Sequence, residues 1–597
     1  MRLIPPRLHG LVTAALLLSA FFGNVAAWAA PTQPPQHTLE AADFAGLRGD
    51  YRLPSGELAL LGGWPAHGRW TQRLFLEVDG VRRPLRAVAS DRFVTADGDT
   101  LRVVRDADGV RGLELTGADG AANGLAERLA LYSEQDVAFT SHGITLAGTL
   151  LLPPGAGPHP AVVLVHGAGA DGREPYRSLA DFFARHGIAA LIYDKRGVAD
   201  SAGDWQLASF EDLADDAIAA AQLLRTQPKI DPARVGLWGI SQGGWITPIA
   251  AARSADIAFI IPVSGSGVSP ARQELWRIGN NLRYRELSPA AIAIGLKGNQ
   301  MLYSLKPLAQ RGWISLPPTL WFRALDLWLD PSAIWQRVRQ PVLAIWGETD
   351  GLVPTPESVE VVKTALDRGG NAHYTLRVFG AADHGLLQAV EGFQNEQRPR
   401  VAYVDGYREA MAQWISGLPH GADGRQVILP ATATPTRLAW HGSAREPTPW
   451  FGQAIVQLPL LLGFVLLFVW LAVGVPIARL IRRWRSRPHA PSPSLCRARL
   501  LAGSAAALGL VALAGWGATL VPTLLEGGDP FLAGHPLSLV VARVAAVGAA
   551  LAFAGLGVVV AGLRRAQAFT RLGYAAAVFA GLVFIRWAWY WQLFPGL

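Results

Sequence analysis

The chain is poor in cysteine and in charged residues. Cys496 is the single cysteine among 597 residues, so no internal disulfide holds the fold together. Charged residues make up 17% of the chain and hydrophobic residues 50%, and the mean hydropathy is +0.22. This balance is too apolar for a disordered chain or for a water-soluble protein of this length. Part of the chain is therefore expected to lie in a lipid bilayer.

The excess of positive charge is confined to two short stretches. Residues 479–499 contain seven arginines and residues 564–571 contain three, and neither stretch contains an acidic residue. Subtracting these ten arginines from the net charge of +8 leaves −2 for the rest of the chain. A protein that binds nucleic acid carries its basic residues over a folded surface, so this class of function is excluded. Lysine is rare, with five residues against 49 arginines, a bias typical of a GC-rich bacterial genome.

Signatures of metal and nucleotide sites are also missing. The sequence has no H-E-x-x-H motif, no paired cysteines and no clustered histidines. It also lacks the G-x-x-x-x-G-K-[ST] phosphate-binding loop. We therefore expect neither a metal nor a cofactor.

Residues 1–29 are typical of an export signal. Two arginines precede an apolar run over residues 11–22, and the small residues of Ala27-Trp28-Ala29 fit a cleavage site after Ala29. The mature chain is then predicted to begin near residue 30. An uncleaved membrane anchor is the alternative, although the apolar run is short for a span.

Four apolar stretches near the C-terminus are long enough to cross a bilayer about 30 Å thick. They cover residues 453–477, 500–520, 537–563 and 572–591, within a membrane domain over residues 451–597. The arginine-rich loops follow the first and third stretches, whereas the loop after the second contains two acidic residues and no basic one. The positive-inside rule makes the arginine loops cytoplasmic. The predicted location is the bacterial inner membrane, as a multi-pass protein whose globular part lies on the periplasmic face.

Arg543 and Arg586 fall within the predicted spans. An arginine inside a bilayer has a functional role by default. Both lie near the ends of their spans, where a long side chain snorkels to the interface, and this second interpretation is favoured.

Residues 30–125 predict a small antiparallel β-domain. Short alternating runs are separated by the turn dipeptides Asp79-Gly80, Asp97-Gly98 and Asp108-Gly109. The pattern resembles the lipocalin-like β-domain that accompanies several families of exported serine hydrolases, through Tyr51, Leu53, Gly56, Phe93 and the run 108–115. Packing, guiding of substrate and protein binding are the roles open to it, because it has no cluster of side chains suited to catalysis.

Residues 126–418 predict an α/β domain. From residue 137, apolar runs of strand length alternate with amphipathic segments of helix length, the pattern of a parallel sheet covered by helices. The expected strands cover residues 144–152, 161–165, 189–193, 235–238, 259–263, 342–346 and 374–379. Residues 419–450 are rich in Pro, Thr, Gly and Ser and predict a tether to the first span.

The run Gly239-Ile240-Ser241-Gln242-Gly243 predicts a nucleophile elbow. It follows the fourth expected strand and precedes a helix expected over residues 245–252. The glycines let the turn close sharply, so the Ser241 hydroxyl is exposed at the strand end beside a helix N-terminus. A serine in this position needs an acid and a histidine, which follow it in the chain in that order.

Both partners appear in the expected order. Asp350 lies in the loop after the sixth expected strand, and His384 in the loop after the seventh. Loops at the carboxyl edge of a parallel sheet are where such folds place their sites. Glu348 is the alternative acid, but the position of Asp350 before Gly-Leu-Val-Pro favours Asp350. Asp383 is expected to be a turn residue, because adjacent side chains on a loop point apart.

The backbone N–H groups of Gln242 and Ala168 are the candidate oxyanion donors, since one follows the nucleophile and the other follows the second expected strand. His166 is expected to shape the loop that holds Ala168. Four other polar residues are expected to be structural or exposed bystanders: Asp194, Arg196, His373 and His420.

Residues 137–418 resemble the α/β-hydrolase superfamily. The runs HGAGADGR at 166–173 and YDKRGVADS at 193–201 are most similar to bacterial carboxylesterases of the dienelactone-hydrolase and acyl-thioesterase-like branch. The resemblance implies acyl transfer to water through an acyl-serine intermediate. It makes His384 the base and Asp350 the residue that fixes the imidazole tautomer.

The leading hypothesis is an exported, membrane-tethered serine esterase. Its substrate would be a small-molecule or lipid-borne ester or thioester, and the sequence identifies no protein partner. A serine peptidase or an acyltransferase on the same scaffold stays open, because fold and triad do not set the leaving group. The third alternative is a membrane scaffold whose hydrolase-like domain only binds a partner.

Nearly eighty residues separate the fifth and sixth expected strands, more than a crossover helix needs. This insertion, residues 268–338, is predicted to be a helical lid. Its many aromatic residues would line an acyl pocket or form the core of the lid. The predicted architecture is an α/β-hydrolase fold with a helical lid, preceded by a small antiparallel β-domain and followed by four transmembrane helices.

Overall fold

The computed structural model describes residues 37–64, 73–316, 325–389, 401–418, 424–433, 448–485, 492–525, 537–562 and 568–594. The predicted export signal lies outside these residues. The described residues form two compact units. The first lies within Gln36–Tyr284 and Lys306–Glu446, and the second within Arg285–Leu305 and Pro447–Leu597.

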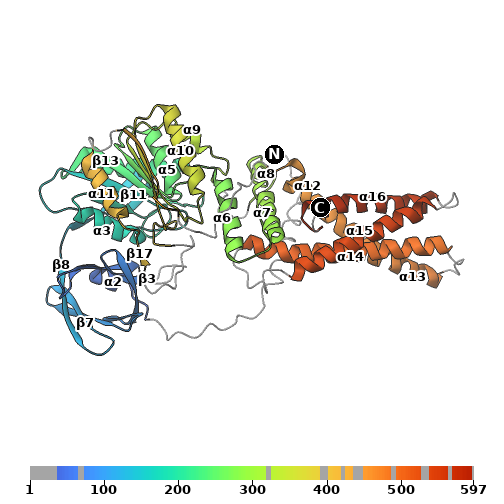
Figure 1. The fold of residues 1–597 in the computed structure, drawn as a ribbon, viewed down its shortest axis with the longest axis horizontal. Helices are drawn as coiled ribbons and strands as arrows, with labels where there is room; N and C mark the ends of the chain where they lie inside the picture. The colour runs from blue at the N-terminus through green and yellow to red at the C-terminus, as the bar shows by residue number, and fades with distance from the viewer. Residues whose placement is uncertain are drawn as a thin grey trace. The chain divides into compact units, whose positions relative to one another are not determined.

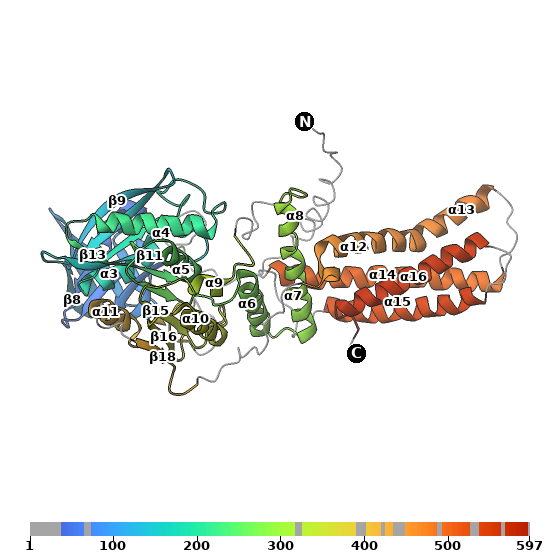
Figure 2. The same cartoon turned by 90° about the horizontal axis from the view of Figure 1, so that it is seen from above.

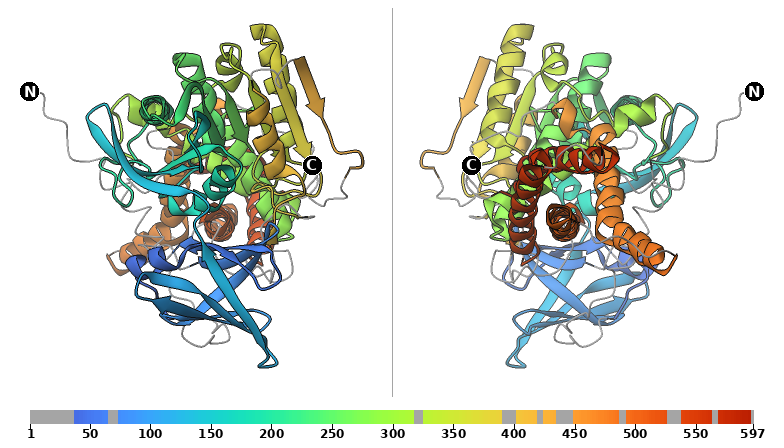
Figure 3. Two further views of the ribbon diagram at one scale, coloured as in Figure 1. Left: turned by 90° about the vertical axis from the view of Figure 1, so that its left-hand side faces the viewer. Right: turned by 90° about the vertical axis from the view of Figure 1, so that its right-hand side faces the viewer.

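The first unit begins with a closed β-barrel (Figures 1 and 3). Its eight strands are β1 (Gly49–Arg52), β2 (Leu58–Trp64), β3 (Arg73–Val78), β4 (Val81–Ala89), β5 (Arg92–Thr95), β6 (Thr100–Asp106), β7 (Gly109–Thr116) and β8 (Ala122–Leu129). Each strand pairs antiparallel with the next, and β8 pairs with β1, which closes the barrel. The predicted antiparallel β-domain is confirmed in this form, whereas its likeness to lipocalins stays a prediction.

Apolar side chains fill the barrel interior. The short helix α2 (Ala41–Leu47) contributes Phe44, and the strands contribute Tyr51, Phe93 and Leu113, none of them more than 1% exposed. Eight strands enclose a space just wide enough for their own side chains. The barrel therefore has a packed hydrophobic core of its own.

The rest of the first unit is built on a nine-stranded sheet. Its strands are β9 (Ser133–Ser141), β10 (Ile144–Leu152), β11 (His159–Val165), β12 (Ala189–Tyr193), β13 (Ile230–Ile240), β14 (Ile260–Val263), β15 (Val342–Gly347), β16 (His373–Phe379) and β18 (Gly424–Ile428). They lie in the order β18-β16-β15-β14-β13-β11-β12-β10-β9. Strand β10 runs antiparallel to both neighbours, and the pairings from β12 to β18 are parallel. All seven expected strands are present.

Helices cover both faces of this sheet (Figure 1). Helices α4 (Phe210–Arg225), α5 (Gly243–Arg253) and α10 (Thr355–Gly369) pack on one face, and α3 (Arg177–Arg185) and α11 (Tyr407–Gly417) pack on the other. Burial on both faces explains why the strand sequences are continuous apolar runs. It also leaves the carboxyl ends of the parallel strands as the edge on which a site forms.

Strand β18 departs from the expectation for residues 419–450. Their composition predicts a tether, but Gly424–Ile428 pairs in parallel with β16 and extends the sheet. The outer edge of β16 offers unpaired backbone groups, and these provide the partners. The tether prediction is therefore wrong for this segment.

The long insertion after β14 is helical and is divided between the two units. Helices α6 (Pro270–Tyr284), α8 (Lys306–Gln310) and α9 (Pro331–Trp335) belong to the first unit, whereas α7 (Pro289–Tyr303) belongs to the second. The prediction of one lid over residues 268–338 is therefore wrong for α7. Gly298 of α7 packs against Leu520 on α14, a helix of the second unit.

The second unit contains four helices that are long and apolar enough to cross a membrane (Figure 2). These candidate spans cover Ala454–Ile481, Pro493–Leu524, Leu537–Ala561 and Arg571–Tyr590, and the four predicted spans match them. The first comprises α12 (Ala454–Val469), a π-helical turn (Trp470–Gly474) and most of α13 (Val475–Arg485). The others are α14 (Pro493–Leu525), α15 (Leu537–Ala561) and α16 (Ala568–Tyr590).

Helix α7 is an integral part of the second unit. A Cβ added to Gly298 would overlap the side chain of Leu520 on α14, so the two helices approach closely. The hydroxyl of Ser304, just after α7, accepts a hydrogen bond from the N–H of Ala454 at 2.8 Å. These contacts hold a segment of the insertion against α12 and α14.

Buried ion pairs join the barrel to the α/β domain. Glu77 on β3 is buried and bonds to Arg82 on β4 and to Arg408 on α11. Arg82 also donates to the Tyr403 hydroxyl at 2.9 Å. Burial opposes ionisation of Glu77, yet the two guanidinium groups hold its pKa below the usual value. Glu77 is therefore the shared counter-ion of a barrel arginine and a helix arginine.

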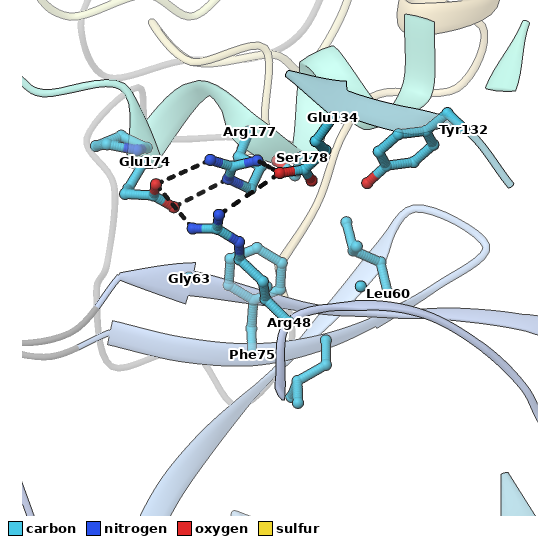
Figure 4. Close-up of a pocket in the computed structure, with 13 residues that line it drawn as sticks. Arg48, Leu60, Gly63, Phe75, Tyr132, Glu134, Glu174, Arg177 and Ser178 are labelled. Carbon is cyan, nitrogen blue, oxygen red and sulfur yellow. Dashed lines mark hydrogen bonds and ion pairs between the residues drawn. The ribbon is translucent and has the colours of Figure 1, made fainter. Parts of the chain in front are cut away.

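More charged residues line a small cavity at the same junction (Figure 4). Glu174 bonds to Arg48 of the barrel at 2.9 Å and to Arg177 at 3.0 Å. Arg177 also pairs with Glu134 at 2.8 Å. The cavity has a volume of about 20 Å³, room for about one water molecule. The junction is thus nearly filled and is held by paired charges.

Glu77→Gln is expected to lower the free energy of unfolding of the first unit by about 3 to 5 kcal/mol, because the buried Arg408 and the half-buried Arg82 then lose their shared carboxylate. Urea denaturation of detergent-solubilised protein, followed by tryptophan fluorescence, measures the loss. Glu114→Gln is the matched control, since Glu114 and its partner Arg102 are half exposed and such a pair contributes about 0 to 1 kcal/mol. Equal effects of the two substitutions would contradict this account of the junction.

Candidate active site

Ser241 lies at a strained turn between β13 and α5. Its φ is +55°, a left-handed conformation that is uncommon for residues other than glycine. Its N–H donates to the carbonyl of Val263 at 2.9 Å. A Cβ at Gly239 would lie 2.7 Å from the carbonyl oxygen of Gly243, so the turn closes only with glycine at that position. The strand–turn–helix expected from the sequence is thus the local structure around Ser241.

Asp350 and His384 are hydrogen-bonded to each other. The His384 Nδ1 atom lies 2.8 Å from Asp350 Oδ2, and the Asp350 side chain is fully buried. The other carboxylate oxygen accepts the N–H groups of Leu352 and Val353 at 2.7 and 2.9 Å. Asp350, and not the alternative Glu348, is therefore the carboxylate bonded to the imidazole.

Electrostatics favour a basic imidazole at His384. Burial disfavours its charged form, but Asp350, with a smaller contribution from Asp383, raises the pKa of His384 above its usual value. Asp383 itself accepts the N–H groups of Gly385 and Leu387, the pattern of a turn residue. Burial raises the pKa of Asp383 to about 6.

Ser241 and His384 are connected through the end of β14. The N–H of Ser241 bonds to Val263, and the hydroxyl of the next residue, Ser264, donates to the carbonyl of His384 at 2.8 Å. Within the described residues, no hydrogen bond joins the Ser241 hydroxyl to the His384 ring. Such bonds are often loose in an unliganded enzyme and tighten with substrate. The bridging role of Ser264 is not visible in the sequence, because it depends on where β14 ends.

The two candidate oxyanion donors have free N–H groups. In the part of the chain that the structure describes, the backbone N–H of neither Ala168 nor Gln242 has a hydrogen-bond acceptor. A Cβ added to Gly167 would lie 3.7 Å from the Cβ of Ser241, so the loop that holds Ala168 passes beside the nucleophile. Both N–H groups are therefore available to a ligand.

His166 has the structural role expected of it. Its ring is buried, and Nε2 lies 2.5 Å from the carbonyl of Tyr193. Burial lowers the pKa of His166 to about 3, so the ring is neutral at ordinary pH. The adjacent Gly167 N–H donates to the Tyr176 hydroxyl at 2.9 Å, which fixes the other side of the loop.

The charged residues in the loop after β12 form ion pairs and hydrogen bonds with other parts of the α/β domain. Asp194 pairs with Arg173 at 2.7 Å, and Arg196 pairs with Asp216 at 2.6 Å. Between them lies Lys195, buried and bonded to backbone carbonyls. These contacts fit the structural role expected of Asp194 and Arg196, whereas no pattern in the sequence points to a role for Lys195.

Two histidines named from the sequence take no part in this arrangement among the described residues. His373 is exposed at the start of β16, and His420 lies outside the described residues. Among the described residues, no group of three or more His, Cys, Asp or Glu side chains could hold a metal ion.

Several known proteins are similar to part of this chain. Residues 142–295 match the family model described as X-Pro dipeptidyl-peptidase (S15 family). The chain is 29% identical over 272 residues to the esterase EstD of Thermotoga maritima, which covers 43% of this chain and 60% of that protein. It is 28% identical over 149 residues to acyl-coenzyme A thioesterase 3 of Mus musculus, covering 25% and 31% of the two chains.

A third relative is the thiohydrolase aneE of Aspergillus aculeatus, 33% identical over 172 residues, or 28% of this chain and 53% of that protein. The chain thus spans about 30 to 60% of the length of these curated relatives. Among solved structures, an esterase of Pyrococcus furiosus is 16% identical with a TM-score of 0.30, covering 41% of this chain and 81% of that one. The family match and the named relatives point to the α/β-hydrolase superfamily and support a hydrolase of ester or thioester type.

Asp350→Asn is expected to lower the pKa of His384, because the carboxylate is what raises it against burial. Diethylpyrocarbonate reacts with neutral imidazole, so the pH at which His384 becomes reactive, followed by mass spectrometry of its peptide, measures the change. The midpoint is expected above the usual value of about 6.5 in the wild type and at lower pH in the variant. Asp383→Asn removes a weaker charge and is expected to shift the midpoint less; an unchanged midpoint in Asp350→Asn would refute this electrostatic account.

Proposed function

We propose that this chain is an exported, membrane-tethered serine hydrolase that cleaves carboxylic esters or thioesters. The hydrogen-bonded pair Asp350 and His384 carries the proposal, because it lies at the same sheet edge as the strained turn of Ser241. The relatives named esterase, thiohydrolase and thioesterase support the substrate class.

The proposed reaction begins when Ser241 Oγ attacks the carbonyl carbon of the substrate and His384 Nε2 accepts the hydroxyl proton. Asp350, bonded to Nδ1, fixes the tautomer and stabilises the imidazolium that forms. The N–H groups of Ala168 and Gln242 donate to the oxyanion of the tetrahedral intermediate. The C–O or C–S bond then breaks, the alcohol or thiol leaves with the proton from His384, and the acyl group remains on Ser241.

Water completes the cycle by the same route. His384 removes a proton from a water molecule, whose oxygen attacks the acyl carbon. The second tetrahedral intermediate collapses, the carboxylic acid leaves, and Ser241 recovers its proton. Each half-reaction therefore uses one base and one pair of N–H donors.

A peptidase is the second candidate, because the matching family is described as an X-Pro dipeptidyl-peptidase. A peptidase that binds a free N-terminus presents a carboxylate to the substrate amine. In the α6 region, Glu274 instead pairs with Arg277 at 2.6 Å, and Arg272 pairs with Glu357. Because Glu274 and Glu357 already have arginine partners, they are not free to bind a substrate amine, and this favours esters over peptides.

The apolar helices support the proposed location. Arginine-rich loops follow the first and third candidate spans, which favours an extracytoplasmic α/β domain at the bacterial inner membrane. Lipid-borne esters and small esters of the periplasm are the substrates within reach of a hydrolase held there. The packed, ion-paired barrel fits a bracing role for the α/β domain.

Ser241→Ala is expected to reduce hydrolysis of p-nitrophenyl esters by a factor on the order of 10³ or more, because loss of the nucleophile removes the covalent route. Initial rates of the purified full-length protein in detergent at neutral pH, over a series of acyl chain lengths, measure the loss and size the acyl pocket. Aminoacyl p-nitroanilides assayed in parallel separate esterase from peptidase: faster turnover of the amides would reject the ester assignment. Equal rates for the wild type and Ser241→Ala would reject a serine hydrolase.

Cys496 reports the topology, since it is exposed and is the single cysteine of the chain. A membrane-impermeant maleimide is expected to label it in inverted membrane vesicles and to leave it unlabelled in intact spheroplasts. Ser55→Cys in a Cys496→Ser background is the matched probe, because Ser55 lies on an exposed turn of the barrel. It is expected to label in spheroplasts, and the reverse pattern would contradict the proposed orientation.

A further inference from the structure

Lys195 is a buried cation outside the proposed triad. It follows β12 and is 2% exposed. Its ammonium donates to the carbonyl of Gly167 at 2.6 Å, to the carbonyl of Gly169 at 2.9 Å and to the side-chain oxygen of Gln242 at 3.2 Å. Three acceptors use all three of its protons.

The charge of Lys195 is not balanced by a directly bonded carboxylate. Within the described part of the chain, the hydrogen-bond acceptors of the ammonium are all neutral oxygens. Asp171 acts on it only through space, and the Trp205 ring centre lies 5.9 Å away. A buried cation held by neutral groups is costly, so packing alone is a weak reason for its presence.

The Gly167 carbonyl and the Ala168 N–H belong to the same peptide group. Because that group is planar and trans, its C=O and N–H point in opposite directions. The bond from Lys195 therefore fixes the carbonyl and aims the Ala168 N–H away from the ammonium. A cationic donor on the carbonyl oxygen also polarises the amide and makes its N–H a stronger donor.

Gln242 is held by the same ammonium. Its backbone N–H is the second candidate oxyanion donor, and its side-chain oxygen accepts a bond from Lys195. Lys195 thus connects the loop after β11 to the residue that follows the nucleophile. These two segments must keep a fixed spacing if both N–H groups are to reach one oxygen atom.

We propose that Lys195 is a positioning residue that orients and polarises the oxyanion hole. The inference rests on the proposed hydrolase function, because it assigns Lys195 a part in stabilising the charge that develops on the substrate. Lys195 acts through the Gly167–Ala168 peptide and through Gln242, without touching the substrate.

The protonation state of Lys195 makes the role measurable. Burial lowers its pKa to about 8, against the opposing effect of Asp171. His166, from the end of β11, faces it as a neutral ring, because the pKa of His166 is lowered to about 3. The ammonium is present below pH 8 and is lost as the pH rises through that value, so activity is expected to fall on this alkaline limb.

The test compares Lys195→Met with the wild-type full-length protein in two reactions at Ser241. Phosphonylation by a fluorophosphonate and hydrolysis of a p-nitrophenyl ester both place a negative oxygen in the oxyanion hole. Both rates are expected to fall by a factor on the order of 10², with KM for the ester changed less than about threefold. Lys363→Met is the matched control, since Lys363 pairs with Asp367 on the exposed side of α10, and it is expected to leave both rates unchanged.

A pH profile supplies a readout that simple loss of packing would not produce. Lys195→Met is expected to lose the alkaline limb near pH 8. Gln242→Glu keeps the backbone N–H and puts a carboxylate beside the ammonium, so it is expected to move this limb upward by about one pH unit or more. This variant decides the question if thermal unfolding shows that Lys195→Met does not fold.

The possible failures are distinguishable. Unchanged phosphonylation in folded Lys195→Met, or an alkaline limb that stays in place in Gln242→Glu, would overturn the role of Lys195 and leave the hydrolase proposal intact. Lack of fluorophosphonate labelling at Ser241 in the wild type would overturn the proposed function and, with it, the role of Lys195.

Discussion

The left-handed backbone at Ser241 is the constraint on which the rest of the site depends. Such a conformation costs on the order of 1 to 3 kcal/mol and persists only where the surroundings leave no alternative. Here the surroundings are strand β13, which is buried on both faces, and helix α5, which starts two residues after Ser241. The strand and the helix are in close backbone contact at Gly239 and Gly243. The N–H of Ser241 is bonded to Val263, whose neighbour Ser264 holds the His384 loop. Nucleophile, base and acid are therefore positioned by one continuous set of backbone contacts at the sheet edge.

The sequence was most informative where the chemistry is local. The strand, turn and helix around Ser241 are encoded within residues 235–252, so their spacing alone predicts the elbow. Asp350 and His384 follow their strands directly, and parallel strands bring their carboxyl ends to one edge. Their mutual bond could therefore be expected without knowledge of the full fold.

Features that depend on distant segments could not be predicted. The hydrogen-bond acceptors of Lys195 come from the loops after β11 and β13. No local pattern in residues 193–201 indicates which charged side chain of that segment is buried. Strand β18 forms because β16 leaves an edge unpaired, whereas its own composition resembles a linker. Helix α7 is apolar enough to pack in a lid core or to pack on membrane-spanning helices. Its own sequence does not distinguish these two locations, because they differ only in the helices that α7 contacts.

Helix α7 also means that the two units cannot be separated by one cut. The chain enters the second unit at Arg285, leaves it at Leu305 and enters it again at Pro447. A shortened protein that stopped before Pro447 would keep α7 but lose Leu520 and the other side chains that cover it. The bared face would be an exposed apolar patch, which promotes aggregation. A water-soluble form of the catalytic unit therefore requires a polar linker in place of residues 285–305 as well as removal of the C-terminal helices.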